Sequence, residues 1–239
     1  MICAIHQPNF FPWLGYFDKL SRVDAFVLLN QVDYEKSGHS MQCYTNRVGI
    51  LKNGKSSWIH CPVVREHGAQ SICDVRINNK TDWRNELKNT LRECYKSAAY
   101  YNDVAEYIFS LISFETNYLS EYNIHIIEEL VKHLDLKAKL FRQDQFQTTL
   151  HSTELLIELV KAVDCDCYLF GGGGTKYQQD ELFEKQGIKL IGQNFQFPHY
   201  EQVSQPFVPG VSILDTLFNC GFDGTKYILN ANKQQLKTQ

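Results

Sequence analysis

The sequence predicts an α/β fold, in which a Rossmann-like parallel sheet is flanked by helices and carries a small antiparallel β insertion and a helical middle region. At both ends of the chain, short apolar segments rich in β-branched residues alternate with segments of helical periodicity. Between those ends, residues 31–80 form short, partly alternating β-type segments, and residues 81–138 have helical spacing. We therefore expect a single domain over residues 1–239, with residues 139–239 as its second α/β half.

The first strand–helix–strand unit opens the chain. Residues 2–6, ICAIH, predict a short strand, and residues 24–30, DAFVLLN, predict a buried one. Two prolines prevent regular structure after the first strand, and apolar residues then recur at helical spacing over about 13–22. Because ligands of parallel sheets bind beyond the carboxyl ends of the strands, His6 and Asn30 are expected at neighbouring strand ends where function is located.

The insertion is predicted to be a small β-sheet and the middle region a group of helices. The segments MQCYTNRVGI, SSWIHCPVV and ICDVRIN predict an antiparallel meander over the mouth of the parallel sheet, with Asn53-Gly54 as a type I′ hairpin turn. Helices are expected from Thr81 as N-cap, over residues 100–112 and over residues 115–134. Core packing is the favoured interpretation of these helices.

The second half repeats the strand–loop–helix–strand order with a different loop. Residues 152–163 predict a helix, and CYLF and IKLIG predict strands on either side of GGGGTKYQQDELFEKQG. A helix from about Thr175 would let peptide N–H groups face an anion, with Lys176 adding charge and Tyr177 a hydroxyl or flat ring. The pattern is neither a Walker A loop nor GxGxxG, so a flexible surface connection is the competing interpretation. The backbone freedom comes from four consecutive glycines: Gly171, Gly172, Gly173 and Gly174.

The opening loop, HQPNFFPWLGYFDKL, concentrates functional groups. His6 is suited to act as a base, to hold phosphate or to be a buried structural residue. Gln7 and Asn9 offer amide donors and acceptors, while Trp13 and Tyr16 offer flat faces for a sugar or a base. The two prolines leave little conformational entropy to lose on binding. Taken alone, the loop fits a ligand site and a packed turn equally well.

Composition excludes several classes of function. The net charge is −3, from 24 Lys+Arg and 27 Asp+Glu, without a block of like charges, which argues against binding to nucleic acid or to an anionic membrane. No apolar run reaches roughly 18 residues and no secretory signal is evident, so we expect a cytosolic protein without a transmembrane segment. The eight cysteines show no CxxC pair, which predicts structural thiols and no metal site.

These motifs resemble the WbqC-like family, whose chains open with a HQPxxxPWxGYF pattern. The resemblance continues through DAFVLLNQVDYEK, through QCYTNRVGI with Asn46 and Arg47, through YLFGGGGTKYQQDELFEKQGI and through FVPGVSILDTLFNCG. It implies a cytosolic transferase acting on a sugar or nucleotide-sugar in the biosynthesis of O-antigen or other surface polysaccharide. Glycine or aminoacyl transfer to an amino sugar is the activity suggested for some members. Asn46 and Arg47 would then clamp an anionic group of this small-molecule substrate.

Roles for the other candidate residues follow from the same resemblance. His6 would be the base that deprotonates a sugar amine or hydroxyl, with Asp33 as a second candidate acid or base. The glycine run and Lys176 would cradle phosphate or a developing oxyanion. Asp215 and Asn219, on a short helix near the C-terminus, would complete the pocket. Neither a cofactor nor an oligomeric state is indicated.

Two alternatives stay open at this point. The start of the chain and the segment YLFGGGGTKYQQ are also similar to nucleotidylyl transferases of the pantothenate-synthetase kind, which predicts a transferase binding ATP or another nucleotide. A noncatalytic nucleotide-sugar-binding protein is the other alternative. All three interpretations depend on one expectation, that the histidine–proline loop and the glycine run meet at one rim of a shared parallel sheet.

Overall fold

Five parallel strands form the centre of the computed structural model, which describes residues 1–34, 44–64, 66–172 and 179–235. The strands are β1 (Ile2–His6), β2 (Ala25–Leu28), β5 (Lys139–Arg142), β6 (Cys167–Phe170) and β7 (Lys189–Gly192). Their order across the sheet is β5-β2-β1-β6-β7, so the chain runs outward from β1 first to one side and then to the other. This doubly wound order confirms the predicted Rossmann-like sheet.

The helices surround this sheet. They are α1 (Leu14–Ser21), α2 (Trp83–Tyr95), α3 (Tyr101–Ile112), α4 (Leu119–His133), α5 (Ser152–Ala162), α6 (Asp180–Lys185) and α7 (Ile213–Gln235), with short 3-10 turns η1 (Ile72–Asp74) and η2 (Gln143–Gln145). All but α6 begin within a few residues of the predicted positions, because each carries a clear apolar stripe. The predicted N-cap of the second helix is wrong by one residue: Asp82, not Thr81, precedes α2, and its side chain makes no capping bond.

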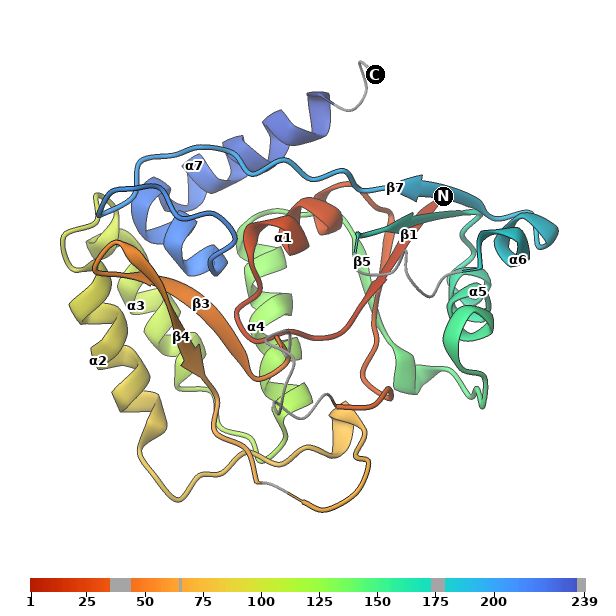
Figure 1. The fold of residues 1–239 in the computed structure, drawn as a ribbon, viewed down its shortest axis with the longest axis horizontal. Helices are drawn as coiled ribbons and strands as arrows, with labels where there is room; N and C mark the ends of the chain where they lie inside the picture. Colours follow the sequence, from red (N-terminus) through yellow and green to blue (C-terminus); the bar gives the residue numbers. More distant parts are fainter. Residues whose placement is uncertain (35–43, 65, 173–178, 236–239) are drawn as a thin grey trace.

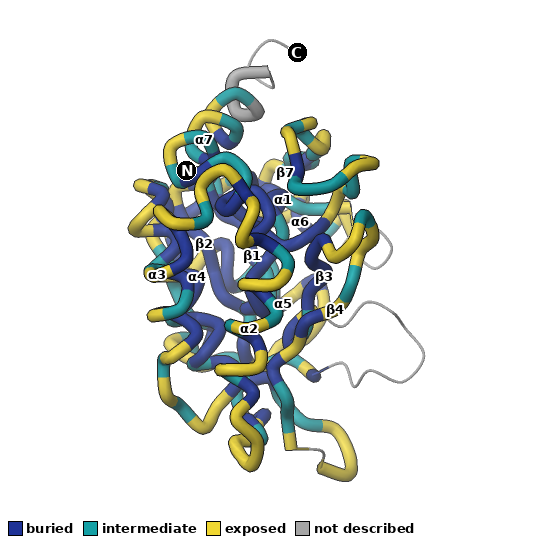
Figure 2. Tube along the Cα trace, turned by 90° about the vertical axis from the view of Figure 1, so that its left-hand side faces the viewer, coloured by how far each residue is buried: buried dark blue, intermediate teal, exposed yellow. Residues whose placement is uncertain are grey.

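Strand alternation distributes the sheet between two cores. Ala4 of β1 faces the larger core, which includes the apolar residues of α1, α4 and the first half of α7. Its neighbours Cys3 and Ile5 face a second core built with α5 and α6. Both faces are therefore covered, as a parallel sheet requires, and β1 and β2 run through the dark-blue interior of Figure 2.

The parallel pairing aligns the strand ends. Cys3 pairs with Ala25 and His6 with Leu28 across β1 and β2, while Ile2 pairs with Cys167 of β6 on the other side. The residues that follow β1, β2, β6 and β7 consequently emerge at one edge of the sheet.

A two-stranded antiparallel hairpin makes up the regular part of the insertion. β3 (Arg47–Lys52) pairs with β4 (Lys55–His60), and Asn53 and Gly54 between them have φ angles of 52° and 73°. Two positive φ angles are those of the type I′ turn that Asn-Gly favours, so this prediction is confirmed. The third predicted strand is wrong, because ICDVRIN contains η1 and isolated bridges only.

The hairpin is placed by hydrogen bonds to helices. The hydroxyl of Tyr95 in α2 accepts from Leu51 N at 3.1 Å, and Ser212, just before α7, donates to Gly49 O at 2.7 Å. The hairpin thus packs beside α2 and the start of α7 (Figure 1).

The last helix is divided near its first third. Gly221 has φ 69° and ψ 180°, and a Cβ there would lie 2.7 Å from Tyr100 Cδ1, so glycine answers both a backbone and a packing requirement. The part before this kink matches the short helix that the sequence predicts. Within the described ranges, every helix is too short or too polar to cross a bilayer.

Candidate ligand site at the sheet switch point

A cavity of about 390 Å³ opens where the strand order reverses, beyond the carboxyl ends of β1, β6 and β7. We call it the switch-point pocket. His6 contributes from the end of β1, Trp13 and Tyr16 from the loop and helix that follow, and Gly171 and Gly172 from the segment after β6. The histidine–proline loop and the described part of the glycine run therefore meet at one rim of the sheet. This is the crevice in which doubly wound proteins bind their ligands.

Lys19 is the principal charged group of this pocket. Its side chain is 4% exposed, lies on the same face of α1 as Gly15 and Tyr16, and makes no hydrogen bond or ion pair within the described chain. Its Nζ lies 3.1 Å from the point that a Cβ on Gly171 would occupy, so a side chain at this position would push the ammonium slightly aside. Lysine is almost never this buried without a partner.

Burial lowers the pKa of Lys19 from 10.5 to about 8, with the Asp18 carboxylate acting against the shift and Arg22 adding to it. The side chain is still mostly protonated at neutral pH. A buried ammonium that faces a cavity and has no ion-pair partner among the described residues is suited to bind an anion.

A buried network holds α1 against the end of β7 and thereby positions Lys19. Arg22 Nη1 donates to Asp18 Oδ2 at 3.1 Å and to Gln193 O at 2.6 Å. Gln193 Nε2 in turn donates to Gly15 O at 2.6 Å and to Asp18 Oδ2 at 3.0 Å. These bonds use the amide nitrogen of Gln193, whereas its Oε1 lies 3.5 Å from the Cβ position of Gly171, on the pocket side.

His6 is a neutral imidazole in this environment. Burial, with the nearby Lys19 charge, lowers the pKa of His6 from 6.5 to about 3. Its Nδ1 lies 3.2 Å from Gln7 O, a carbonyl that can only accept, so Nδ1 carries the proton and Nε2 is left as the acceptor. The Tyr16 ring packs edge-on at 4.8 Å, and its hydroxyl donates to the same carbonyl at 3.2 Å.

Aromatic rings line the opening of the pocket. Trp13 contacts Phe195 at 5.1 Å and Phe197 at 5.5 Å between ring centroids, and Phe170 lies at the end of β6. Phe197 is 50% exposed. The site therefore combines one buried positive charge with flat apolar faces, which suits an anionic ligand carrying a sugar or a base.

Part of the glycine loop lies outside the described residues, and so do four of its candidate residues: Gly173, Gly174, Lys176 and Tyr177. The expected helix start at about Thr175 also lies there, and the described helix α6 begins at Asp180 and has 6 residues. Gly171 and Gly172 line the pocket, and because glycine has no side chain, their backbone forms this part of the wall.

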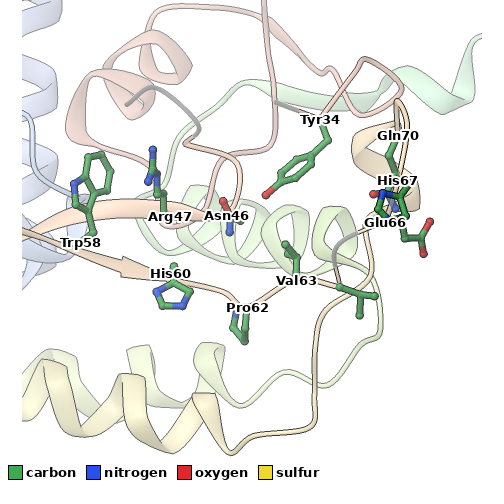
Figure 3. Close-up of a pocket in the computed structure, with 11 residues that line it drawn as sticks. Tyr34, Asn46, Arg47, Trp58, His60, Pro62, Val63, Glu66, His67 and Gln70 are labelled. Carbon is green, nitrogen blue, oxygen red and sulfur yellow. The ribbon is translucent and has the colours of Figure 1, made fainter. Parts of the chain in front are cut away.

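Asn46 and Arg47 lie in a different cavity, of about 640 Å³, which we call the hairpin pocket. It is formed by the ends of β3 and β4, the segment after β4, and Tyr34 beyond β2. Figure 3 shows Arg47 beside Trp58 at one end, Glu66, His67 and Gln70 at the other, and Tyr34 and Asn46 between them. The sequence suggested one site for all these residues, but the structure separates them into two pockets.

The opening loop connects the two pockets. Asn123 Nδ2 donates both to Pro8 O at 2.8 Å and to Thr45 O at 2.7 Å, and Phe10 N donates to Tyr44 O at 3.0 Å. Residues 7–12 therefore run from His6 in one pocket to the strand that enters the other.

The remaining candidates in the loop and after β2 have structural surroundings. Asn9 is buried, and its Oδ1 has no hydrogen-bond partner in the described chain. Asn30 is fully buried, and its Nδ2 donates to Asp144 Oδ2 at 2.7 Å, which fixes η2 beside the end of β2. Asp33 is exposed and forms a backbone bridge with Ser71. None of the three lines either pocket in the described chain.

Asp215 belongs to a buried network. Its carboxylate accepts from Tyr95 at 3.0 Å, from Tyr200 at 2.8 Å and from Gln202 at 2.8 Å. Burial raises the pKa of Asp215, and these hydrogen bonds partly oppose the rise. Asn219 donates to Asp215 O at 2.7 Å. In the described chain, neither Asp215 nor Asn219 lines either pocket. The hydrogen bonds of Asp215 instead tie α7 to α2 and to the segment that precedes α7.

Sequence reasoning missed Lys19, Gln193 and Trp58. A signal existed for the first, because Lys19 follows Gly15 by four residues and Tyr16 by three in the predicted helix, and so shares their face. Gln193 directly follows IKLIG, where a parallel strand ends at its functional edge. Among the described residues, no cluster of His, Cys, Asp and Glu has an arrangement that would hold a metal ion.

Comparison with known proteins identifies the family. The model of the WbqC-like protein family matches residues 7–227. The chain belongs to the WbqC-like family. A similar relative is the uncharacterized protein Rv1507c of Mycobacterium tuberculosis (strain ATCC 25618 / H37Rv), which is 28% identical over 229 residues, covering 94% of this chain and 96% of the relative. No solved structure matches this WbqC-like chain significantly.

Proposed function

We propose that this WbqC-like chain is a cytosolic transferase acting on a nucleotide-sugar in surface-polysaccharide biosynthesis, and that the switch-point pocket holds the phosphate groups of that substrate. The observation that carries the proposal is Lys19, an ammonium 4% exposed with no partner in the described chain. Such a charge is unfavourable in the empty protein and favourable once an anion pairs with it.

The rest of the pocket supports the same class of ligand. Gly171 and Gly172 allow the backbone after β6 to approach phosphate oxygens closely. Trp13, Phe170 and Phe195 offer faces against which a base or a sugar ring can pack. A nucleotide-sugar has both parts, a diphosphate and flat or apolar rings.

His6 is suited to the proton transfer of an acyl transfer to a sugar amine. The amine nitrogen attacks the carbonyl carbon of an activated aminoacyl donor, the new N–C bond forms, and the leaving group departs with its electron pair. The proton that the amine loses passes to Nε2 of His6, the nitrogen left free by the Gln7 contact. A phosphate beside Lys19 neutralises one cause of the low pKa of His6, so the imidazole becomes a stronger base when substrate is bound.

The experiment is calorimetric titration with uridine diphosphate, uridine diphosphate glucosamine and inorganic pyrophosphate, followed by mass spectrometry of the sugar after incubation with glycyl thioester or glycyl adenylate. Lys19→Met should weaken binding by about 10- to 100-fold, in line with the roughly 1.5–3 kcal/mol of a charged hydrogen bond. Lys189→Met, which removes an exposed lysine from the opposite end of β7, is the matched control. His6→Gln should bind normally and form no acylated sugar. Equal affinity in wild type and Lys19→Met would refute the proposal.

One observation favours a second candidate, a nucleotidylyl-type transferase. The doubly wound strand order with a histidine at the end of β1 is an arrangement that binds nucleotides at the switch point. Exchange of labelled pyrophosphate into ATP, without acylated sugar in the first assay, would support this activity in place of acyl transfer.

A further inference from the structure

The hairpin pocket has the features of a second ligand site, separate from the switch-point pocket. Trp58 is 40% exposed and Tyr44 is 41% exposed, with ring centroids 6.1 Å apart. Trp58 lines the cavity and Tyr44 packs beside it, and exposed aromatic rings of this kind mark a surface that gains stability when a ligand covers it. The cavity volume of about 640 Å³ lies within the roughly 300–1,000 Å³ of small-molecule sites.

Local strand geometry explains why the indole is open. Trp58 stands directly opposite Gly49 in the β3–β4 register, and a glycine has no side chain to cover it. Ile59, the next residue, points to the buried face, whereas His60 returns to the same face as Trp58. The hairpin therefore presents an aromatic ring and an imidazole side by side towards the pocket.

The indole is also held in one orientation. The guanidinium carbon of Arg47 lies 4.8 Å from the Trp58 ring centroid, in cation–π contact. A ring that is fixed before binding loses little conformational entropy when a ligand stacks on it.

The far end of the pocket is polar and planar. Glu66 and His67 are exposed, and Gln70, whose Nε2 is anchored on Asp74 O at 3.0 Å, lies beside them. Figure 3 shows this group at the opposite end from Trp58. Carboxylate, imidazole and amide groups form hydrogen bonds with hydroxyl groups. The pocket is therefore elongated, with an aromatic end at Trp58 and a polar end that can bind hydroxyls.

We propose that the hairpin pocket is a carbohydrate site that binds a short, unphosphorylated oligosaccharide, with the apolar face of one sugar ring stacked on Trp58 and hydroxyls directed to the polar end. A pyranose has one face of C–H groups and a rim of hydroxyls, which matches this pairing of an aromatic platform with planar polar groups. The site is distinct from the switch-point pocket and does not depend on the reaction proposed there. It gives the protein a place to hold a saccharide beside a nucleotide-sugar, on the other side of the opening loop.

The experiment is saturation-transfer difference NMR with methyl glycosides of glucose, galactose and N-acetylglucosamine, with chitobiose and lactose, and with uridine and adenosine as base probes. We expect saturation of sugar C–H protons in wild type and in Lys19→Met alike. Trp58→Ala should weaken binding about ten-fold or more, as the truncation of an aromatic residue at the centre of a binding site does, while Trp58→Phe keeps most of the affinity. Tyr227→Ala, which removes a ring that is 76% exposed on α7, is the matched control and should bind like wild type.

Circular dichroism verifies the fold of each variant, and His60→Ala supplies a second test at the same face if Trp58→Ala unfolds. Equal glycoside binding in wild type and in the Trp58 and His60 variants overturns the proposal. So does binding of uridine or adenosine without binding of any glycoside, and so does the lack of binding of every probe. Lys19→Met should lose nucleotide-sugar binding and keep glycoside binding. This result would show that the two pockets bind their ligands independently, so the failure of one proposal would leave the other intact.

Discussion

Replacing Lys19 by methionine is expected to make the protein more stable while it weakens anion binding. Methionine keeps the length and apolar character of the side chain and removes the charge. Burial lowers the pKa of Lys19 from 10.5 to about 8, a difference of about 2.5, which at about 1.36 kcal/mol for each ten-fold step corresponds to roughly 3 kcal/mol. Allowing for relaxation around the charge, the free energy of unfolding should rise by roughly 1–3 kcal/mol at pH 7.

The pH dependence gives this prediction a sign that can be checked. The unfolded chain binds the Lys19 proton more tightly than the folded chain, so the cost of the buried charge is full below about pH 8. As the pH rises from about 8 towards 10.5, the folded state has lost the proton while the unfolded chain still holds it, so the cost falls with pH and disappears near pH 10.5. The advantage of Lys19→Met should therefore be largest at pH 7 and shrink steadily above pH 8.

The assay is urea unfolding followed by circular dichroism at pH 7, 8.5 and 10, for wild type, Lys19→Met and Lys189→Met. The exposed control should differ from wild type by less than about 0.5 kcal/mol at every pH. A Lys19→Met variant that is less stable than wild type at pH 7 would refute the reasoning. A stability difference that does not change with pH would do the same, because the buried ammonium would not be its cause.

Three further predictions concern other groups. Wild type should lose stability as the pH falls from about 6.5 towards 3, because His6 stays neutral in the folded protein and is protonated in the unfolded chain. The loss should be about 1.4 kcal/mol for each ten-fold step in proton concentration. His6→Gln should flatten this part of the curve of unfolding free energy against pH, and an unchanged curve would contradict the prediction. Asp215→Ala should lower the free energy of unfolding by about 3–5 kcal/mol, measured with urea, because it leaves two buried donors, Tyr95 and Gln202, and the partly buried Tyr200 without an acceptor. A loss below about 1 kcal/mol would show that water replaces the carboxylate. Gly15→Ala places a Cβ 2.2 Å from the Trp13 ring, so the ring must move. Titration calorimetry should therefore show weaker binding of the nucleotide-sugar. Unchanged affinity would show that Trp13 does not contribute to the proposed site.

The class of sheet and most of the helices and strands could be predicted from the amino-acid sequence. Periodicity placed β1, α1 and β6 within a residue or two, since local apolar spacing decides which segments can bury a face. The Asn53-Gly54 turn was readable because its residue types fix the backbone angles. The strand predicted at ICDVRIN was wrong because its β-branched residues are buried by packing in the main core and not by pairing in a ladder.

Which residues share a site could be seen only in the folded chain. The separation of Arg47 from His6 into two pockets depends on how the hairpin packs on α2 and α7, which its own sequence does not encode. The surroundings of Lys19 likewise depend on Gln193, 174 residues later in the chain, because its side chain and that of Arg22 both donate to Oδ2 of the neighbouring Asp18. Charge, exposure and pairing are properties of surroundings assembled from distant segments. The helix alone therefore shows a lysine, whereas the fold shows a buried ammonium without a partner among the described residues.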